Sequence, residues 1–226
     1  MKDITTERVQ IFADRKRTNI LRTREQQFIH FLLKKIPGFI SPNIMTGVGM
    51  FGSVIVCAAF LLGANFGSVF LPIGIIGLFI NWFGDSLDGR LAYYRGIARK
   101  WYGFALDIIM DWLSIILIGV GYYFYETDST RILGFIFVVC YGWSMIISLL
   151  RYKILGVYRI DAGLLGPTEL RVIIAIILLL ETVIPGSITY SAIITTLILL
   201  VINLKDTNAL LELGNDRDRK EREIKP

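Results

Sequence analysis

The chain contains, from residue 36 to residue 84, the uncharged stretch IPGFISPNIMTGVGMFGSVIVCAAFLLGANFGSVFLPIGIIGLFINWFG. A helix needs roughly 20 mostly apolar residues to cross a hydrocarbon core about 30 Å thick, so this stretch is long enough for two crossings. Two further stretches, 132–150 and 182–204, also lack charged residues. The chain has 54% hydrophobic and 19% charged residues and a mean hydropathy of +0.59. This composition is typical of a multi-span membrane protein and excludes a secreted, nucleic-acid-binding or disordered chain.

Six membrane-spanning helices account for the apolar stretches. Ser41 is predicted to cap the first helix, with Pro42 at its first position, and Pro185-Gly186 is predicted to end the fifth. We therefore expect an all-α membrane protein with spans at about 41–63, 70–84, 102–124, 131–152, 166–184 and 187–204.

Two charged segments flank this transmembrane domain, which is predicted to cover residues 41–204. The N-terminal segment, 1–40, is basic and includes an apolar stretch with basic ends, 28–36, which is predicted to lie along the membrane surface as an amphipathic helix. The C-terminal segment, 205–226, is predicted to be a charged tail whose last residues, from 214 onward, are frayed.

The basic residues predict the orientation in the membrane. With six spans, both termini and the second and fourth loops lie on one side, and every Lys and Arg of the chain except Arg131 falls on that side. By the positive-inside rule this side is cytoplasmic, so we expect a multi-pass membrane protein with both termini in the cytoplasm.

Two pairs of aspartates lie near the cytoplasmic ends of the second and third spans. Asp85 and Asp88 are three residues apart, and Asp107 and Asp111 are four apart, so each pair projects from one helical face. Because the two helices are consecutive and antiparallel, the pairs can meet in a cluster of four carboxylates. Such a cluster needs protons or divalent cations for neutralisation, and oxygen ligands without His or Cys favour Mg²⁺ or Mn²⁺. The alternative is that the aspartates mark helix ends at the lipid headgroups.

Small residues are interleaved with these carboxylates at Gly89, Ala92 and Gly103. They allow a bulky planar group to approach the helix backbones, as a nucleotide would require. A charge belt at the headgroups would not need them.

The pattern Asp85-x-x-Asp88-Gly89-x-x-Ala92, followed by Gly103-x-x-x-Asp107-x-x-x-Asp111, resembles the signature of the CDP-alcohol phosphatidyltransferase family. The resemblance extends over about 38–204 and includes Pro42-Asn43 and Thr46 at the start of the first span. Two features depart from the family pattern: Tyr93 stands where an arginine usually follows the alanine, and the gap before Gly103 is one residue longer than in the commonest form. Arg95 is the candidate to supply the missing guanidinium.

The resemblance implies an enzyme that transfers a phosphatidyl group from a CDP-linked lipid to an alcohol acceptor and releases CMP. It implies that two Mg²⁺ or Mn²⁺ ions are held by the four aspartates, with Asp111 also accepting the proton of the attacking hydroxyl. It further implies a homodimer and a nucleotide site formed by Asn43, Thr46, Gly89, Ala92, Arg95 and Gly103.

A second site is predicted where the first, third and fifth spans direct their N-terminal ends toward the same side, since helix N-termini attract anions. Four cations surround the start of the fifth span: Arg151, Lys153, Arg159 and Arg171. They are candidates to bind the phosphate of an acceptor or a lipid headgroup. The alternative is ordinary positive-inside flanking charge.

Several functions remain open at this point. The preferred reaction transfers the phosphatidyl group of CDP-diacylglycerol to a polyol or polyol phosphate. In the reverse arrangement, CDP-choline or CDP-ethanolamine is the donor and a lipid alcohol is the acceptor. A divalent-cation transporter is the alternative from a different class, but transporters usually place their ligands near the membrane midplane. A structural scaffold would leave the acidic residues unexplained. No nucleic-acid partner is expected.

Overall fold

The structure is a computed structural model that describes residues 29–155 and 167–224. Within these residues the chain is helical, with no strands. The α-helices are α3 (Pro42–Phe66), α4 (Pro72–Tyr94), α5 (Lys100–Tyr125), α6 (Ile132–Leu155), α7 (Pro167–Val183) and α8 (Ser187–Ile224), and short 3-10 helices lie at η1 (Ser68–Phe70) and η2 (Ser129–Arg131).

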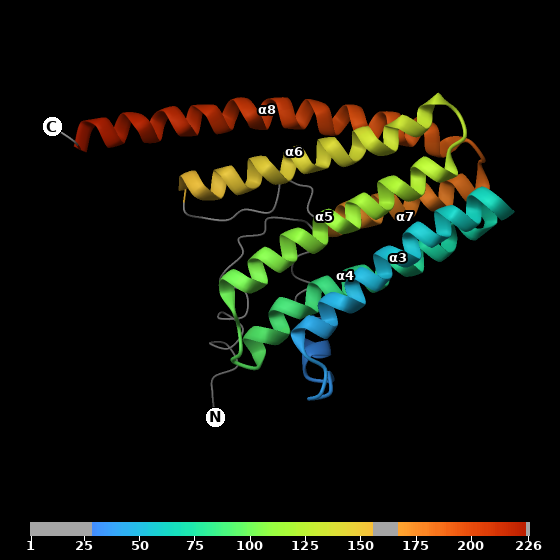
Figure 1. The fold of residues 1–226 in the computed structure, drawn as a ribbon, viewed down its shortest axis with the longest axis horizontal. Coiled ribbons are helices and arrows are strands. Elements are labelled where there is room, and N and C mark those ends of the chain that lie inside the picture. The colour runs from blue at the N-terminus through green and yellow to red at the C-terminus, as the bar shows by residue number, and fades with distance from the viewer. Residues whose placement is uncertain (1–28, 156–166, 225–226) are drawn as a thin grey trace.

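The helices run side by side between two ends of the molecule (Figure 1). The turns from α3 to α4, α5 to α6 and α7 to α8 lie at one end, and the C-terminal ends of α4, α6 and α8 lie at the other. This antiparallel order is the one predicted for a multi-span membrane protein, so the all-α membrane fold is confirmed.

Five stretches of the described residues are long and apolar enough to cross a membrane, and they contain α3, α4, α5, α6 and α8. The remaining helix, α7, has 17 residues. The count of six crossings therefore stays a prediction.

The first span begins where the sequence predicts. The Ser41 hydroxyl accepts a hydrogen bond from the Ile44 amide at 3.2 Å, and Pro42 occupies the first turn, where its missing N–H costs nothing. The helix continues to Phe66 and ends before Gly67, whose φ of 101° suits a glycine.

Glycines bring α3 and α4 unusually close together. A Cβ atom at Gly52 would overlap the backbone of Asn81 and Gly77, and one at Gly84 would overlap the backbone of Met45 and Gly49. Small residues allow such close contact between membrane helices. The packing fixes the part of α4 that carries Asp85.

The main core joins α3, α4, α5, α7 and α8. Its buried members are Val56, Phe60, Leu71, Leu78, Tyr122, Ile174, Leu178 and Ile188. It anchors α7 beside α4, and it holds the N-terminal half of α7 next to the aspartates.

The segment predicted to lie along the membrane surface is described only from residue 29 onward. Residues 29–33 are helical, and Ile29 and Leu33 are buried against Leu87 and Leu91 of α4. One face of this segment thus packs on the helix ends. Residues 1–28 of the predicted N-terminal segment lie outside the described residues.

The C-terminal tail differs from the prediction. The described residues 214–224 are not frayed, because α8 continues without a break from the apolar span to Ile224. Arg217 pairs with Glu221 at 2.9 Å on the same helix and donates hydrogen bonds to the carbonyl oxygens of Lys153 and Ile154 at 2.9 and 2.8 Å. An i,i+4 ion pair and contact with the end of α6 therefore stabilise the helical tail.

Candidate active site

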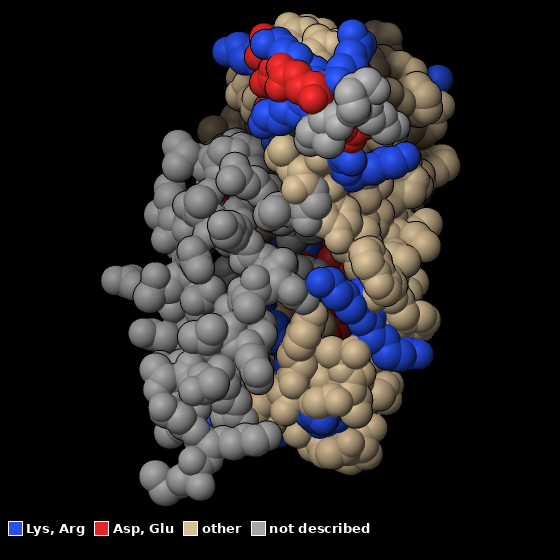
Figure 2. All heavy atoms as spheres, turned by 90° about the vertical axis from the view of Figure 1, so that its left-hand side faces the viewer, with Lys and Arg blue, Asp and Glu red and all other residues tan. Residues whose placement is uncertain are grey.

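The structure brings the four aspartates together at one end of the helix bundle. Asp85 and Asp88 come from α4, Asp107 and Asp111 come from α5, and all four line one small cavity. Figure 2 looks at this end of the molecule and shows acidic side chains recessed between Lys and Arg side chains. The helical spacing that predicted two facing pairs thus agrees with their arrangement.

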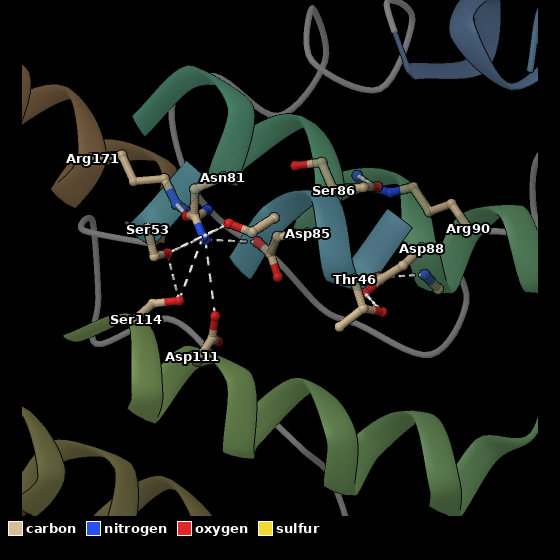
Figure 3. Close-up of polar contacts among 12 residues, drawn as sticks. Thr46, Ser53, Asn81, Asp85, Ser86, Asp88, Arg90, Asp111, Ser114 and Arg171 are labelled. Carbon is tan, nitrogen blue, oxygen red and sulfur yellow. Dashed lines mark hydrogen bonds and ion pairs between the residues drawn. The ribbon is translucent and has the colours of Figure 1, made fainter. Parts of the chain in front are cut away.

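Thr46 connects α3 to this cluster. Its hydroxyl donates a hydrogen bond of 2.7 Å to Oδ2 of Asp88, and the Gly89 amide donates to the other carboxylate oxygen. Two donors from α3 and α4 therefore fix the orientation of the Asp88 carboxylate (Figure 3).

Arg171, at the start of α7, enters the same cluster. Its Nη2 lies 2.8 Å from Oδ2 of Asp85 and 3.9 Å from Oδ1 of Asp111, and its side chain is only 13% exposed. Figure 3 shows the guanidinium reaching from α7 toward the aspartates of α4 and α5. The sequence grouped Arg171 with the cations predicted to bind the acceptor and did not predict its contacts with Asp85 and Asp111.

A buried polar network lies on the inner side of Arg171. The Nε of Arg171 donates to Oδ1 of Asn81 at 2.7 Å, and the Asn81 amide donates to Ser53 Oγ at 2.9 Å and to the Gly49 carbonyl at 3.1 Å. Ser53 in turn donates to Ser114 Oγ at 2.8 Å. Asn81, which accepts the hydrogen bond of Arg171, is therefore itself held in place by α3, and Ser53 connects this network to α5.

A larger cavity of about 540 Å³ opens beside the carboxylates. This volume is within the range of sites for small organic ligands and cofactors. Its lining includes all but one of the residues predicted to bind the nucleotide, namely Asn43, Thr46, Gly89, Ala92 and Gly103, together with Asp88 and Asp107. A Cβ atom at Gly89 or Gly103 would meet no atom within 4 Å, so both glycines border open space.

The exception is Arg95, which does not line this cavity. Its guanidinium instead donates hydrogen bonds to backbone carbonyl oxygens of the segment that precedes α3, including Pro37 at 2.9 Å and Ile40. Arg95 thus connects α4 to that segment, and this position argues against contact with a bound nucleotide.

Arg99 supplies a guanidinium at the cavity instead. It lies 3.8 Å from the ring centre of Tyr102, donates to the Asn43 side chain at 3.4 Å, and lines the cavity. Arg99 was not among the residues predicted to bind the nucleotide, although its place in the loop between the two halves of the motif indicates a position near the site.

Of the other three cations predicted for an acceptor site, the structure describes two, Arg151 and Lys153, and both belong to α6. Arg151 lies 3.6 Å from Asp206 of α8, and Lys153 is in the last turn of α6. Arg159 lies outside the described residues. Of the four, only Arg171 reaches the carboxylates in the described structure.

The donor set fits hard divalent cations. In residues 29–155 and 167–224, no three acidic, His or Cys side chains converge closely enough to hold an ion as they stand. Arg171 and Thr46 bind two of the carboxylates in this arrangement. Four aspartates around one cavity nevertheless provide the oxygen ligands that Mg²⁺ and Mn²⁺ prefer.

Comparisons with known proteins identify the family and a shared fold. The model of the CDP-alcohol phosphatidyltransferase family matches residues 39–203. Among solved structures, the chain is similar to phosphatidylinositol phosphate synthase of Mycobacterium tuberculosis with CDP-DAG bound, at a TM-score of 0.56 and 17% identity. The match covers 82% of this chain and 92% of that one, and at this identity it shows a shared fold. A comparison with curated proteins finds no match.

Proposed function

The chain belongs to the CDP-alcohol phosphatidyltransferase family, and from that premise we propose that it transfers a phosphatidyl group from CDP-diacylglycerol to a polyol or polyol phosphate and releases CMP. One observation carries this proposal. The cavity of about 540 Å³ shares Asp88 and Asp107 with the carboxylate cluster and is lined by the small residues of the family motif.

The cavity is the proposed site of the CDP moiety. Gly89 and Gly103 leave open space where other residues would project a side chain, so a planar base can approach α4 and α5 there. Asn43 and Thr46 provide polar groups on the α3 side. Arg99 is the proposed partner of the diphosphate, because it brings a guanidinium to the cavity where the motif arginine is replaced by Tyr93.

The four aspartates are the proposed ligands of two Mg²⁺ or Mn²⁺ ions. When bound, two ions neutralise the diphosphate and stabilise the leaving phosphate oxygen. Thr46 holds the Asp88 carboxylate by a 2.7 Å hydrogen bond, which limits the reorganisation needed for ligation.

Asp111 is the proposed base. The acceptor hydroxyl oxygen forms a bond to the lipid-bearing phosphorus of the donor while the bond between that phosphorus and the bridging oxygen breaks, and CMP leaves. The proton of the hydroxyl passes to a carboxylate oxygen of Asp111. Asp111 borders the interior cavity that Arg171 and Asn81 also line, on the side of the cluster away from the proposed nucleotide site. This position supports attack from the side opposite the leaving group.

The acceptor is proposed to bind near Arg171, with Arg151, Lys153 and Arg159 attracting an anionic molecule to the cytoplasmic face. We also retain the predictions that both termini and the active site are cytoplasmic and that the protein forms a homodimer in the bilayer. Transfer from CDP-choline or CDP-ethanolamine to a lipid alcohol remains the alternative reaction, whereas family membership disfavours a cation transporter.

The test is CMP release by the purified protein in detergent with Mg²⁺ or Mn²⁺. CDP-diacylglycerol is supplied with glycerol phosphate, inositol phosphate or the free polyols, and CDP-choline with diacylglycerol is supplied in parallel. Asp88→Asn should abolish release, and the matched variant Asp128→Asn, in the turn at the opposite end of the helices, should not. Metal-independent release, or full activity of Asp88→Asn, would refute the proposed mechanism.

A further inference from the structure

Arg171 occupies oxygen atoms that the proposed metal site requires. Its Nη2 lies 2.8 Å from Oδ2 of Asp85, which is the distance of a strong charge-assisted hydrogen bond. The same nitrogen lies 3.9 Å from Oδ1 of Asp111, so it bridges the carboxylates of α4 and α5 (Figure 3). A divalent ion that bound this oxygen of Asp85 would compete with the guanidinium for it.

The guanidinium is held from a second direction. Asn81 is 7% exposed and accepts the Nε hydrogen bond of Arg171 at 2.7 Å, while its own amide is fixed by Ser53 and the Gly49 carbonyl. Arginine suits this position because its planar group can bond Asn81 through Nε and a carboxylate through Nη2 at once. Loss of the carboxylate contact would therefore leave Arg171 tethered beside the site.

These contacts suggest a role that the family motif does not include, since Arg171 lies outside it. We propose that Arg171 is an internal counter-cation that binds Asp85 and Asp111 in the metal-free protein and is displaced from them by the divalent ion, while Asn81 is the positioning residue that retains it at the site. The proposal rests on the proposed metal-dependent function. It explains how acidic side chains from two helices remain together before a metal ion binds, because like charges in a partly buried site repel each other.

The test measures Mn²⁺ binding to the full-length protein in detergent, without CDP-lipid or acceptor, from the electron paramagnetic resonance signal of free Mn²⁺. Arg171→Gln removes the competing charge and should tighten Mn²⁺ binding by roughly tenfold or more, as expected when a charge-assisted hydrogen bond no longer has to be broken. A structural disruption would weaken binding instead, so the sign of the change is informative.

The matched control is Arg90→Gln, which removes another arginine from the same region. Arg90 donates to the Ser86 carbonyl of its own helix at 2.6 Å and lies apart from Arg171 and Asp111 in Figure 3, so its loss should leave Mn²⁺ affinity within about twofold. Melting temperatures give a second measurement: Arg171→Gln should melt below wild type without metal and gain more than wild type from added Mn²⁺.

The metal site is supported if wild type binds Mn²⁺ and Asp85→Asn does not. If Arg171→Gln then binds Mn²⁺ no more tightly than wild type, the proposed role of Arg171 is overturned while the metal site stands. No Mn²⁺ binding by any form would overturn the metal-dependent function as well. If Arg171→Gln does not fold, Arg171→Lys decides the question. A single ammonium group keeps the charge but cannot hold Asn81 and Asp85 in the same way, so Mn²⁺ binding should tighten several-fold, and unchanged affinity would overturn the proposal.

Discussion

Arg95 and Arg99 offer a matched test of the nucleotide site, since both are arginines in or next to the loop between the motif halves. Arg99 lines the cavity of about 540 Å³, whereas Arg95 binds backbone carbonyl oxygens before α3. Arg99→Ala should therefore weaken binding of the CDP-lipid, and Arg95→Ala should weaken the fold.

The magnitudes follow from the contacts. A hydrogen bond to a charged group contributes about 1.5–3 kcal/mol, and because Arg99 is exposed the lower value applies, which corresponds to roughly a tenfold rise in KM for CDP-diacylglycerol. Arg95→Ala removes several charged donors from carbonyl oxygens, including those of Pro37 and Ile40, and should lower stability by about 1–3 kcal/mol.

The assay combines CMP release over a range of CDP-diacylglycerol concentrations with thermal unfolding in the same detergent. Arg99→Lys is informative as an intermediate, because it keeps the charge and loses the planar donor group. A selective rise in KM for Arg95→Ala with an unchanged melting temperature would refute the assignment of the two arginines. So would an unchanged KM for Arg99→Ala.

Three other changes test the site and the fold. Asp111→Asn should lower kcat far more than it raises the KM for CDP-diacylglycerol in steady-state CMP release, and a variant with normal kcat but weak Mn²⁺ binding would leave Asp111 as a ligand and not the base. Gly103→Leu should leave the melting temperature nearly unchanged but greatly raise the KM for CDP-diacylglycerol, because its side chain would enter the nucleotide cavity, and normal kinetics would place the nucleotide elsewhere. The Glu181 carboxylate accepts hydrogen bonds from the Gly186 and Ile188 amides at 2.9 and 2.7 Å, at the start of α8. Glu181→Ala should therefore destabilise the fold by about 2–4 kcal/mol in thermal unfolding without a selective effect on the KM of either substrate. A selective change in one KM would contradict this structural role.

Much of the fold could be predicted because membrane helices leave a strong signal in the sequence. Long uncharged stretches marked the spans, and Ser41-Pro42 marked the start of α3 within one residue. The tail was misread because its high charge suggested disorder, although Arg217 and Glu221 already had the i,i+4 spacing that stabilises a helix.

The carboxylate cluster could also be predicted, since helical periodicity alone placed each pair of aspartates on one face. The contacts of the arginines could not. Arg171 reaches Asp85 only because the core packs α7 beside α4, and no spacing within the sequence encodes that neighbour. Arg99 lines the cavity and Arg95 does not, because the chain turns at Gly96, whose φ is 68°, between the two residues.

The close contact of α3 with α4 explains how a helix without charged residues contributes to an acidic site. A Cβ atom at Gly49 would lie 3.2 Å from the Asp85 amide nitrogen, so the backbone of α3 passes directly beside the first aspartate. A larger residue at that position would push α4 away from α3 and would lengthen the 2.7 Å hydrogen bond between Thr46 and Asp88. The same displacement would separate Asn81 from Ser53 and so loosen the support of Arg171. The glycines of the first two spans therefore set the geometry of the carboxylates, although none of these glycines carries a functional group.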